Sequence, residues 1–190
     1  MQSKKIVIGA VIIGRNEGQR LINCIESLKS NIRHIIYVDS GSTDNSVQEA
    51  QNRSVDCISL ELNRPFTAAR ARNKGAKYLV ENYPEIEFIQ FIDGDCEVQS
   101  DWVEKAYTFL IDHDMYAVTC GRRRERFPEK SVYNKLCDIE WDTPVGEAKS
   151  CGGDALIRVS AFTQIGGYNG TLIAGEEPEM CFRLRNKGWK

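Results

Sequence analysis

Two carboxylates separated by one glycine, Asp93-Gly94-Asp95, follow an apolar run that predicts a buried strand. Ionised carboxylates at such a position repel each other unless a cation or hydrogen-bond donors compensate their charge. Their oxygens suit Mg²⁺ or Mn²⁺, and a metal ion there could bridge substrate phosphates and stabilise a diphosphate as it leaves. A polar turn without a ligand explains the tripeptide equally well, because short acidic turns are common.

A second polar cluster, Asp39-Ser-Gly41-Ser-Thr-Asp44, lies between a predicted strand and a predicted helix. Asp39 could accept hydrogen bonds from a base or ribose, and Gly41 would let a ligand approach the backbone. Taken alone, the cluster is better explained as a turn and helix cap. The first predicted strand also ends in polar residues, Asn16 and Glu17. Accumulation of polar residues at strand ends favours a nucleotide site.

Charged residues also occur near the predicted starts of two helices. Arg72 lies close to a helix N-terminus, where a cation is unfavourable unless an anion such as a diphosphate is nearby. Glu176, Glu177 and Glu179 crowd the first turn of the last predicted helix, where acidic residues are favourable without any chemistry. One of these carboxylates could instead act as a general base toward an acceptor hydroxyl. The arginines of residues 122–126 fit either an exposed edge or a contact with an anionic acceptor.

Apolar patterns predict the elements that position these residues. Continuous or β-branched apolar runs predict strands over 5–13, 34–38, 57–60, 88–92 and 117–120, and another after the glycines at 152–153. Apolar stripes predict helices over 21–32, after Asp44, over 67–82, 102–110 and 131–141, and after the acidic turn at 176–179. Such alternation forces crossover connections, hence a Rossmann-like, mainly parallel sheet with helices on both faces, a three-layer α/β fold. Ligands should gather at the carboxyl ends of its strands.

Composition limits the classes of protein that fit. The 190 residues are expected to form one domain, and 25 basic against 27 acidic residues give no support for a nucleic-acid partner. The 7 cysteines are scattered without a C-x-x-C pair, which favours a reducing compartment over a disulfide framework or zinc site. No apolar run has the length of a membrane span. A cytoplasmic protein is therefore expected.

The ordered motifs together resemble those of the family 2 inverting glycosyltransferases, which have the GT-A fold. The resemblance extends from the first strand to Trp189. It implies that a divalent cation, Mn²⁺ or Mg²⁺, is held by Asp95 with Asp93, and that Glu177 or its neighbour Glu176 is the catalytic base. Residues implied in nucleotide-sugar binding are Asn16, Glu17, Asp39, Gly41, Arg72 and Asp93. The sugar and acceptor pocket is implied at Gly152, Gly153 and Asp154.

The resemblance also implies a reaction and a setting. A sugar would pass, with inversion, from a nucleotide-diphosphate sugar to a hydroxyl of a saccharide or lipid-linked acceptor, in cell-surface polysaccharide or glycolipid synthesis. Residues 1–120 would bind the donor, and 121–190 would bind the acceptor and supply the base. Association with the inner face of the membrane is part of this expectation. Family members commonly continue beyond the position of Lys190, so the sequence fits either a chain truncated at its C-terminus or a minimal version of the family.

Two other functions fit parts of the pattern. A sugar-phosphate nucleotidyltransferase also places acidic residues on a metal ion, but the glycine-rich basic signature expected near its first strand is not evident. A nucleotide-sugar binding module without activity would use residues 176–179 only as a helix cap. Gly9 and Gly14 have the spacing of a phosphate loop, yet Arg15-Asn16 replaces the Lys-Ser/Thr pair that an ATP-hydrolysing loop requires.

Overall fold

A mixed central sheet organises the chain, for which a computed structural model describes residues 7–61 and 63–190. The strands of this part are β1 (Ile8–Gly14), β2 (His34–Asp39), β3 (Asp56–Ser59), β4 (Phe88–Asp93), β5 (Val118–Cys120) and β6 (Ala155–Arg158). Their order in the sheet is β3-β2-β1-β4-β6-β5. The pairs among β3, β2, β1 and β4 are parallel, whereas β6 is antiparallel to both β4 and β5. The expected mainly parallel sheet is therefore confirmed, with β6 inserted in the opposite direction.

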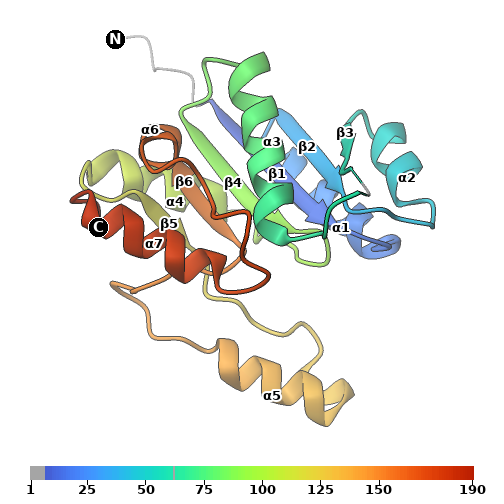
Figure 1. The fold of residues 1–190 in the computed structure, drawn as a ribbon. Coiled ribbons are helices and arrows are strands. Elements are labelled where there is room, and N and C mark those ends of the chain that lie inside the picture. Colours follow the sequence, from blue (N-terminus) through green and yellow to red (C-terminus); the bar gives the residue numbers. More distant parts are fainter. Residues whose placement is uncertain (1–6, 62) are drawn as a thin grey trace.

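Helices cover both faces of the sheet, as expected for three α/β layers (Figure 1). The described helices are α1 (Gln19–Lys29), α2 (Ser46–Asn52), α3 (Ala68–Asn82), α4 (Trp102–Asp112), α5 (Val132–Trp141), α6 (Val159–Gln164) and α7 (Glu176–Asn186), with a 3₁₀ turn at Pro128–Lys130. One core contains buried residues of α3, α6 and α7, and the other contains those of α1, α2 and α4. Within the described ranges, no helix is both long and apolar enough to cross a membrane.

The central strand β1 shows why its sequence is apolar without interruption. Ile8, Ala10 and Ile12 belong to the core with α1, α2 and α4, whereas Val11 and Ile13 belong to the core with α3, α6 and α7. Alternate side chains point to opposite faces, so a strand covered on both faces needs apolar residues at every position. The strand predicted over 5–13 is thus confirmed from residue 8 onward, and residues 5 and 6 lie outside the described part.

Most of the predicted elements are found within a few residues of their expected bounds, and two features differ. The short helix α6 directly follows β6 and was not predicted, because six residues are too few to show a helical period. The direction of β6 was not predicted either. It depends on pairing with β4, in which Phe91 lies opposite Ala155. Such long-range pairing leaves no local signal in the sequence.

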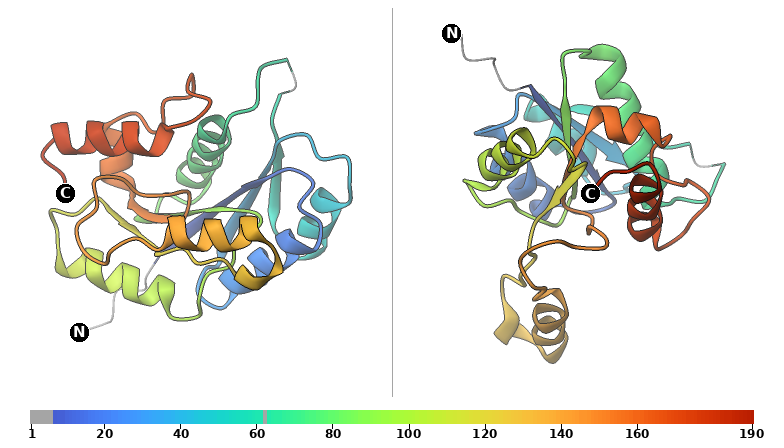
Figure 2. Two further views of the ribbon diagram at one scale, coloured as in Figure 1. Left: turned by 90° about the horizontal axis from the view of Figure 1, so that it is seen from below. Right: turned by 90° about the vertical axis from the view of Figure 1, so that its left-hand side faces the viewer.

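The helix α5 belongs to the long segment that connects β5 to β6, and it lies apart from the three layers (Figure 2). Asn134, Asp138 and Trp141 are half-buried, and their spacing places them on one face of this helix. On the opposite face Val132 and Ile139 are 82% and 63% exposed. Amphipathic helices of globular proteins usually turn the apolar face inward. In α5 a mixed face with Asn134, Asp138 and Trp141 is turned toward the rest of the protein, while these apolar side chains are exposed.

The contact between α3 and β1 gives the first testable prediction. A Cβ atom added at Gly75 would collide with both methyl groups of Val11, one of them at 2.9 Å. Because both elements are buried at this contact, Gly75→Ala should lower the free energy of unfolding by about 1–3 kcal/mol, the usual cost of overpacking. Denaturant unfolding would measure it. The matched control is Lys74→Ala at the exposed neighbouring position, for which a change within about 0.5 kcal/mol is expected. Equal stability of the two variants would contradict the close packing.

Candidate functional site

A hollow of about 320 Å³ opens at the carboxyl ends of the parallel strands. It lies at the ends of β1, β2 and β4 and the start of α3, and its lining residues are Ile13, Gly14, Arg15, Glu17, Ser40, Phe66, Thr67, Ala68, Asp93, Gly94 and Asp95. Open α/β sheets bind their ligands at this end of the strands. The volume is within the range of small-molecule sites. The topology and the hollow therefore indicate the same place for a ligand.

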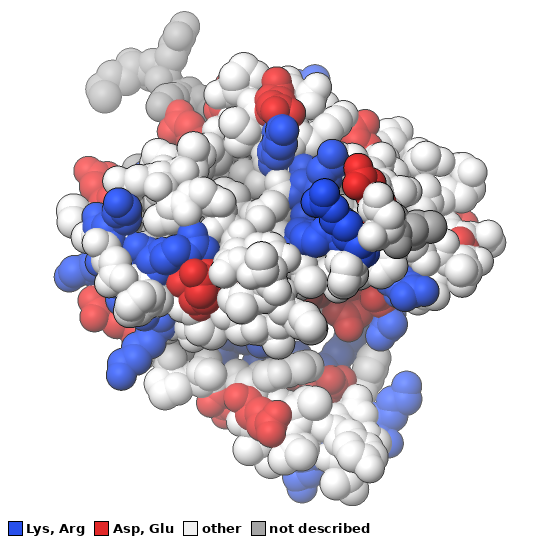
Figure 3. Space-filling model, viewed as in Figure 1, with Lys and Arg blue, Asp and Glu red and all other residues white. Residues whose placement is uncertain are grey.

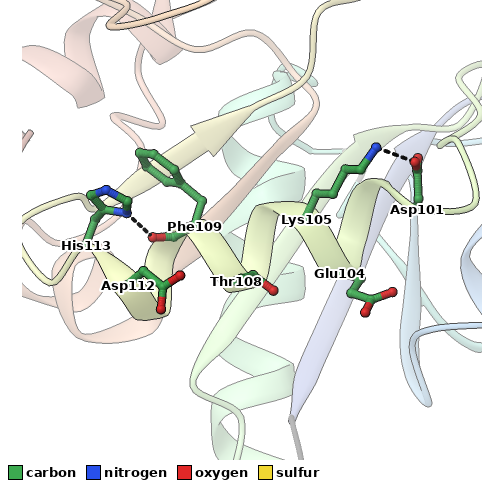
Figure 4. A pocket seen from close by; sticks show the side chains of 7 residues that line it. All are labelled: Asp101, Glu104, Lys105, Thr108, Phe109, Asp112 and His113. Atoms are coloured by element: carbon green, nitrogen blue, oxygen red, sulfur yellow. Dashed lines mark hydrogen bonds and ion pairs between the residues drawn. The ribbon is translucent and has the colours of Figure 1, made fainter.

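A larger hollow, of about 510 Å³, lies along α4 and does not have the character of a site (Figure 4). Its lining residues all belong to one helix and its ends: Asp101, Glu104, Lys105, Thr108, Phe109, Asp112 and His113. The side chains lie side by side along the helix rather than converging, with Lys105 bonded to Asp101 and His113 to the Phe109 carbonyl. We therefore place the candidate site at the strand ends, where chemistry-bearing residues from different elements meet.

The carboxylate of Asp39 shapes the loop after β2. Asp39 is almost fully buried, and its oxygens accept hydrogen bonds from the backbone N–H groups of Gly41 and Ser42, both at 3.0 Å, and from the Tyr37 hydroxyl at 3.1 Å. Gly41 has φ of 89°, a left-handed conformation that favours glycine. Both residues singled out in this cluster are thus needed for the turn itself. That turn forms the wall of the hollow next to Ser40.

Asn16 ties the loop after β1 to the loop after β2. Its side-chain oxygen accepts hydrogen bonds from the backbone of Thr43 at 2.7 Å and of Asp44 at 3.3 Å. Its own N–H donates to the Ser42 hydroxyl at 2.9 Å. Asn16 adopts a positive φ of 56°, which asparagine tolerates better than most residues. The two loops that border the hollow are therefore fixed relative to each other.

Three carboxylates surround the mouth of the hollow, those of Glu17, Asp93 and Asp95. Burial raises the pKa of Glu17, as do the charges of Asp95 and Asp93, while nearby Arg20 opposes the change. The Arg20 guanidinium lies 2.7 Å from Glu17 and 3.8 Å from Asp95. Since Arg20 is exposed, it compensates only part of this negative charge. The mouth therefore favours a cationic group.

Within the described residues, no group of three or more His, Cys, Asp or Glu side chains could hold a metal ion unaided. Asp93 and Asp95 nevertheless provide oxygen ligands at the mouth, and their side chains are 36% and 46% exposed. Mg²⁺ is usually bound by one or two carboxylates together with substrate phosphates and water. This donor set fits a divalent cation that arrives with a phosphorylated ligand.

The buried guanidinium of Arg72 joins the mouth of the hollow to the last helix. Its Nη2 donates to Asp93 at 2.9 Å, and its Nη1 donates to Glu176 and to Glu177, each at 2.9 Å. Burial by itself lowers the pKa of this arginine, but the charges of Asp93 and Glu177 outweigh it, so the pKa is raised. Arg72 is therefore charged at every relevant pH. It brings Asp93 of the acidic motif together with Glu176 and Glu177 of the acidic turn, which the sequence analysis had singled out as two separate clusters.

The backbone of Gly153 packs directly against this ion pair. A Cβ atom at Gly153 would lie 2.6 Å from Asp93 Oδ2 and 2.7 Å from Arg72 Nη2, so no larger residue fits without moving the pair. At Gly152 the nearest group would be the Arg123 guanidinium at 3.0 Å. Gly153 is thus required by close packing at the site, whereas Gly152 faces the end of a flexible side chain.

Asp154 is largely buried beside the same cluster. Its carboxylate lies 3.6 Å from Arg123, and its buried Oδ1 atom has no hydrogen-bond partner in the described part of the chain. Burial raises the pKa of Asp154 to about 6, with Arg123 opposing the change and Asp93 adding to it. A carboxyl group whose pKa is raised this far exchanges its proton near neutral pH, which is a common property of residues at functional sites.

The arginines of residues 122–126 are paired within the protein. Arg122 contacts Asp142, Arg124 contacts Asp138 at 2.7 Å, Arg126 contacts Glu97, and Arg123 lies over the Trp141 ring at 5.2 Å. Figure 3 shows acidic and basic side chains intermixed on the lobe that protrudes below the sheet. The segment therefore presents mixed charge rather than a uniformly basic surface.

Comparison with known proteins decides the family. Residues 10–164 match the model of the family described as glycosyl transferase family 2. The chain belongs to this family. This family 2 chain is 29% identical over 111 residues to an uncharacterised glycosyltransferase of Escherichia coli K12, YibD. The match covers 56% of this chain and 31% of YibD, so it spans less than a third of that relative.

Solved structures confirm the GT-A fold of this family 2 chain. A mannosyltransferase from Pyrobaculum calidifontis, in complex with GDP-Man and Mn²⁺, superposes with a TM-score of 0.70 at 16% identity over 96% of this chain and 53% of its own. Glucosyl-3-phosphoglycerate synthase from Mycobacterium tuberculosis, in complex with UDP, gives a TM-score of 0.70 at 17% identity over 96% of this chain and 66% of its own. The chain spans about half to two thirds of these proteins.

The structure brings together part of the residue set that the sequence indicated for a family 2 site. Arg72, Asp93, Glu176, Glu177 and Gly153 form one cluster. Asp95 and Glu17 share the adjoining mouth, while Asn16, Asp39 and Gly41 form the loops beside it. The sequence analysis did not single out Phe66, which lines the hollow with the Arg15 guanidinium 5.8 Å from its ring. An aromatic residue just before a helix was the only signal for it.

The raised pKa of Asp154 predicts a specific dependence of stability on pH. Between about pH 4 and 6 the folded protein keeps a proton that the unfolded chain releases, so raising the pH favours unfolding. Asp154→Asn removes this effect. From pH 4 to pH 7 the wild type should lose about 2 kcal/mol of stability relative to the variant, measured by denaturant unfolding. Parallel pH profiles of the two proteins would contradict the raised pKa.

Proposed function

We propose that this chain transfers a sugar from a nucleoside diphosphate sugar to an acceptor hydroxyl. The observation that carries the proposal is the shared guanidinium of Arg72, which places Asp93 of the Asp-Gly-Asp motif beside Glu177 of the last helix. A transferase needs a donor site and a base close together, because both act on the same anomeric carbon. The GDP-Man, UDP and Mn²⁺ named in the complexes of the similar folds support this class of donor.

The hollow at the strand ends would hold the nucleotide. Arg15 and Phe66 offer planar groups on its wall, on which a base could stack. The backbone of the loop at Gly41, together with Asn16, Glu17 and Asp39, would border the base and ribose. Residues 1–120 would thus bind the donor, and residues 121–190 would contribute the acceptor side and the base.

Asp95 and Asp93 would hold Mn²⁺ or Mg²⁺ against the donor diphosphate. Asp95 is the stronger candidate, because its carboxylate has no short ion pair among the described residues, whereas one oxygen of Asp93 is bonded to Arg72. When bound, the divalent cation stabilises the negative charge of the diphosphate leaving group. Glu17, at the same mouth, would strengthen the preference for a cation.

Glu177 would accept the proton of the acceptor hydroxyl. Its side chain is 16% exposed against 7% for Glu176, and only its Oε1 is bonded to Arg72. Glu177 therefore keeps an oxygen for the acceptor, while Glu176 is buried. The activated hydroxyl would attack the anomeric carbon in a single displacement, which inverts its configuration. The backbone of Gly152 and Gly153 with Asp154 would border the reacting sugar and limit the access of water.

The acceptor class is proposed on the resemblance to the family alone, without a particular contact to support it. A saccharide or lipid-linked hydroxyl compound in cell-surface polysaccharide or glycolipid synthesis is the acceptor that we propose. The arginines of residues 122–126 already have acidic or aromatic partners, so they offer less to an anionic acceptor than their sequence suggests.

Donor binding is the first test of this proposal. Calorimetry with a panel of nucleoside diphosphates and nucleotide sugars should show binding of one nucleotide class that strengthens in the presence of Mn²⁺. Asp95→Asn should weaken the metal-dependent binding by about tenfold or more, because it removes a charged ligand. Binding of no nucleotide by folded wild-type protein would reject the donor site.

The role of the last helix is tested by Glu177→Gln. We expect donor affinity to be kept and the transfer rate to fall by roughly 10²–10⁴-fold, the usual contribution of a general base. The matched control is Glu179→Gln in the same helical turn, where Glu179 is bonded to Arg183 at 2.7 Å and should have little effect on the rate. A protein that binds donor but is indifferent to Glu177→Gln would be a binding module rather than a transferase acting through this base.

A further inference from the structure

The position of Arg72 leaves little room for a donor phosphate at its guanidinium. The residue is 2% exposed, and both of its Nη atoms are bonded to carboxylates. Its Nε atom is buried and has no hydrogen-bond partner among the described residues, and the Tyr168 ring lies 5.5 Å from its guanidinium carbon. The backbone of Gly153 closes the side next to Nη2. A diphosphate could reach Arg72 only if these ion pairs separated.

The same contacts connect elements that are far apart in the sequence. Arg72 is on α3, Asp93 is the last residue of β4, and Glu176 and Glu177 begin α7. The bonds to the two glutamates span 104 and 105 residues of chain. A planar guanidinium has donors in a fixed fork, so it holds several carboxylates at set angles, which a lysine ammonium cannot do. The orientation of α7 against the donor end of the sheet therefore depends on this group.

We propose that Arg72 is a positioning residue that sets the base, Glu177, relative to the donor-side carboxylate, Asp93, and does not bind the donor itself. This role rests on the proposed transferase function. Glu176 takes part as a buried second anchor, because it shares Nη1 with Glu177 and restrains the direction of that N–H group. The position of the free Glu177 oxygen is then fixed by the ion pairs rather than by the acceptor.

The test separates positioning from donor binding through Arg72→Lys, which keeps the charge but not the fork. Donor affinity, from calorimetry with the nucleoside diphosphate and Mn²⁺, and the donor KM should stay within about threefold of wild type. The kcat for transfer should fall roughly 100-fold, since a displacement of about 1 Å at a reacting group has an effect of that size. Arg70→Lys is the matched control: Arg70 contacts the Pro65 carbonyl and, among the described residues, no carboxylate, and should keep wild-type kcat.

The proposal would be overturned if Arg72→Lys changed donor affinity instead of kcat. If Arg72→Lys raises the dissociation constant of the diphosphate tenfold or more while kcat is unchanged, Arg72 is a donor ligand. If neither quantity changes, it has no role in the reaction. Should Arg72→Lys fail to fold, Glu176→Gln gives the second measurement, because it leaves the bonds of Arg72 to Asp93 and Glu177 available. It should lower kcat at least tenfold with donor affinity unchanged, and unchanged kcat would overturn the anchor role.

Failure of the proposed function would be recognised separately. In that case the wild-type protein would bind no nucleoside diphosphate. The positioning role would then be rejected too, because it depends on the proposed reaction. Unfolding experiments would still detect the ion pairs. Arg72→Lys should lower the free energy of unfolding, and this loss should be smaller in a protein that already carries Glu177→Gln. If the stability losses of the two substitutions add while donor binding is normal, the contact between Arg72 and Glu177 is rejected.

Discussion

A buried guanidinium shared by three carboxylates is the interaction on which the arrangement of the site depends. Arg72 could not be buried without acidic partners, because an unpaired charge in the interior is strongly destabilising. Asp93, Glu176 and Glu177 supply those partners from a strand and a helix that have no sequence proximity. The cost of burying each charge therefore forces α3, β4 and α7 into one relative position. The close packing of Gly153 against this ion pair and the partial exposure of the Glu177 side chain accompany that arrangement.

The other polar residues near the hollow serve the fold and the proposed chemistry at the same time. Asp39 and Asn16 satisfy backbone N–H groups of the loop that follows β2, and so give it a fixed shape. Asp95 and Glu17, in contrast, have few compensating contacts at the mouth. The site thus combines loops of fixed shape with a small region of negative charge that Arg20 compensates only in part. A preorganised wall beside an unsatisfied charge is what a cation–diphosphate ligand requires.

Much of the fold could be predicted from the sequence because β1 is apolar at every position, β4 is apolar except at Gln90 and its terminal Asp93, and the helices carry apolar stripes. The motif positions could be predicted too, since parallel strands bring their carboxyl ends to one edge. The ion-pair partners of the charged residues at the site could not be predicted. Nothing in the spacing of Arg72 and Glu177 indicates that they meet, and a cation near a helix N-terminus suggests an external anion rather than an internal one. The reversed direction of β6 and the outward apolar face of α5 were likewise hidden, because both depend on tertiary contacts.

The strand order also has a consequence for how the chain is made. β5 precedes β6 in the sequence, yet in the sheet it pairs with β6, which lies between it and β4. During synthesis from the N-terminus, β1 to β4 can assemble with their helices as soon as they emerge. β5 must wait until residues 155–158 have been added before it gains its partner strand. A ribosome-bound chain that ends before residue 155 would therefore lack the strand that pairs with β4. The edge of β4 would be open to pairing with another strand, which is a known route to aggregation.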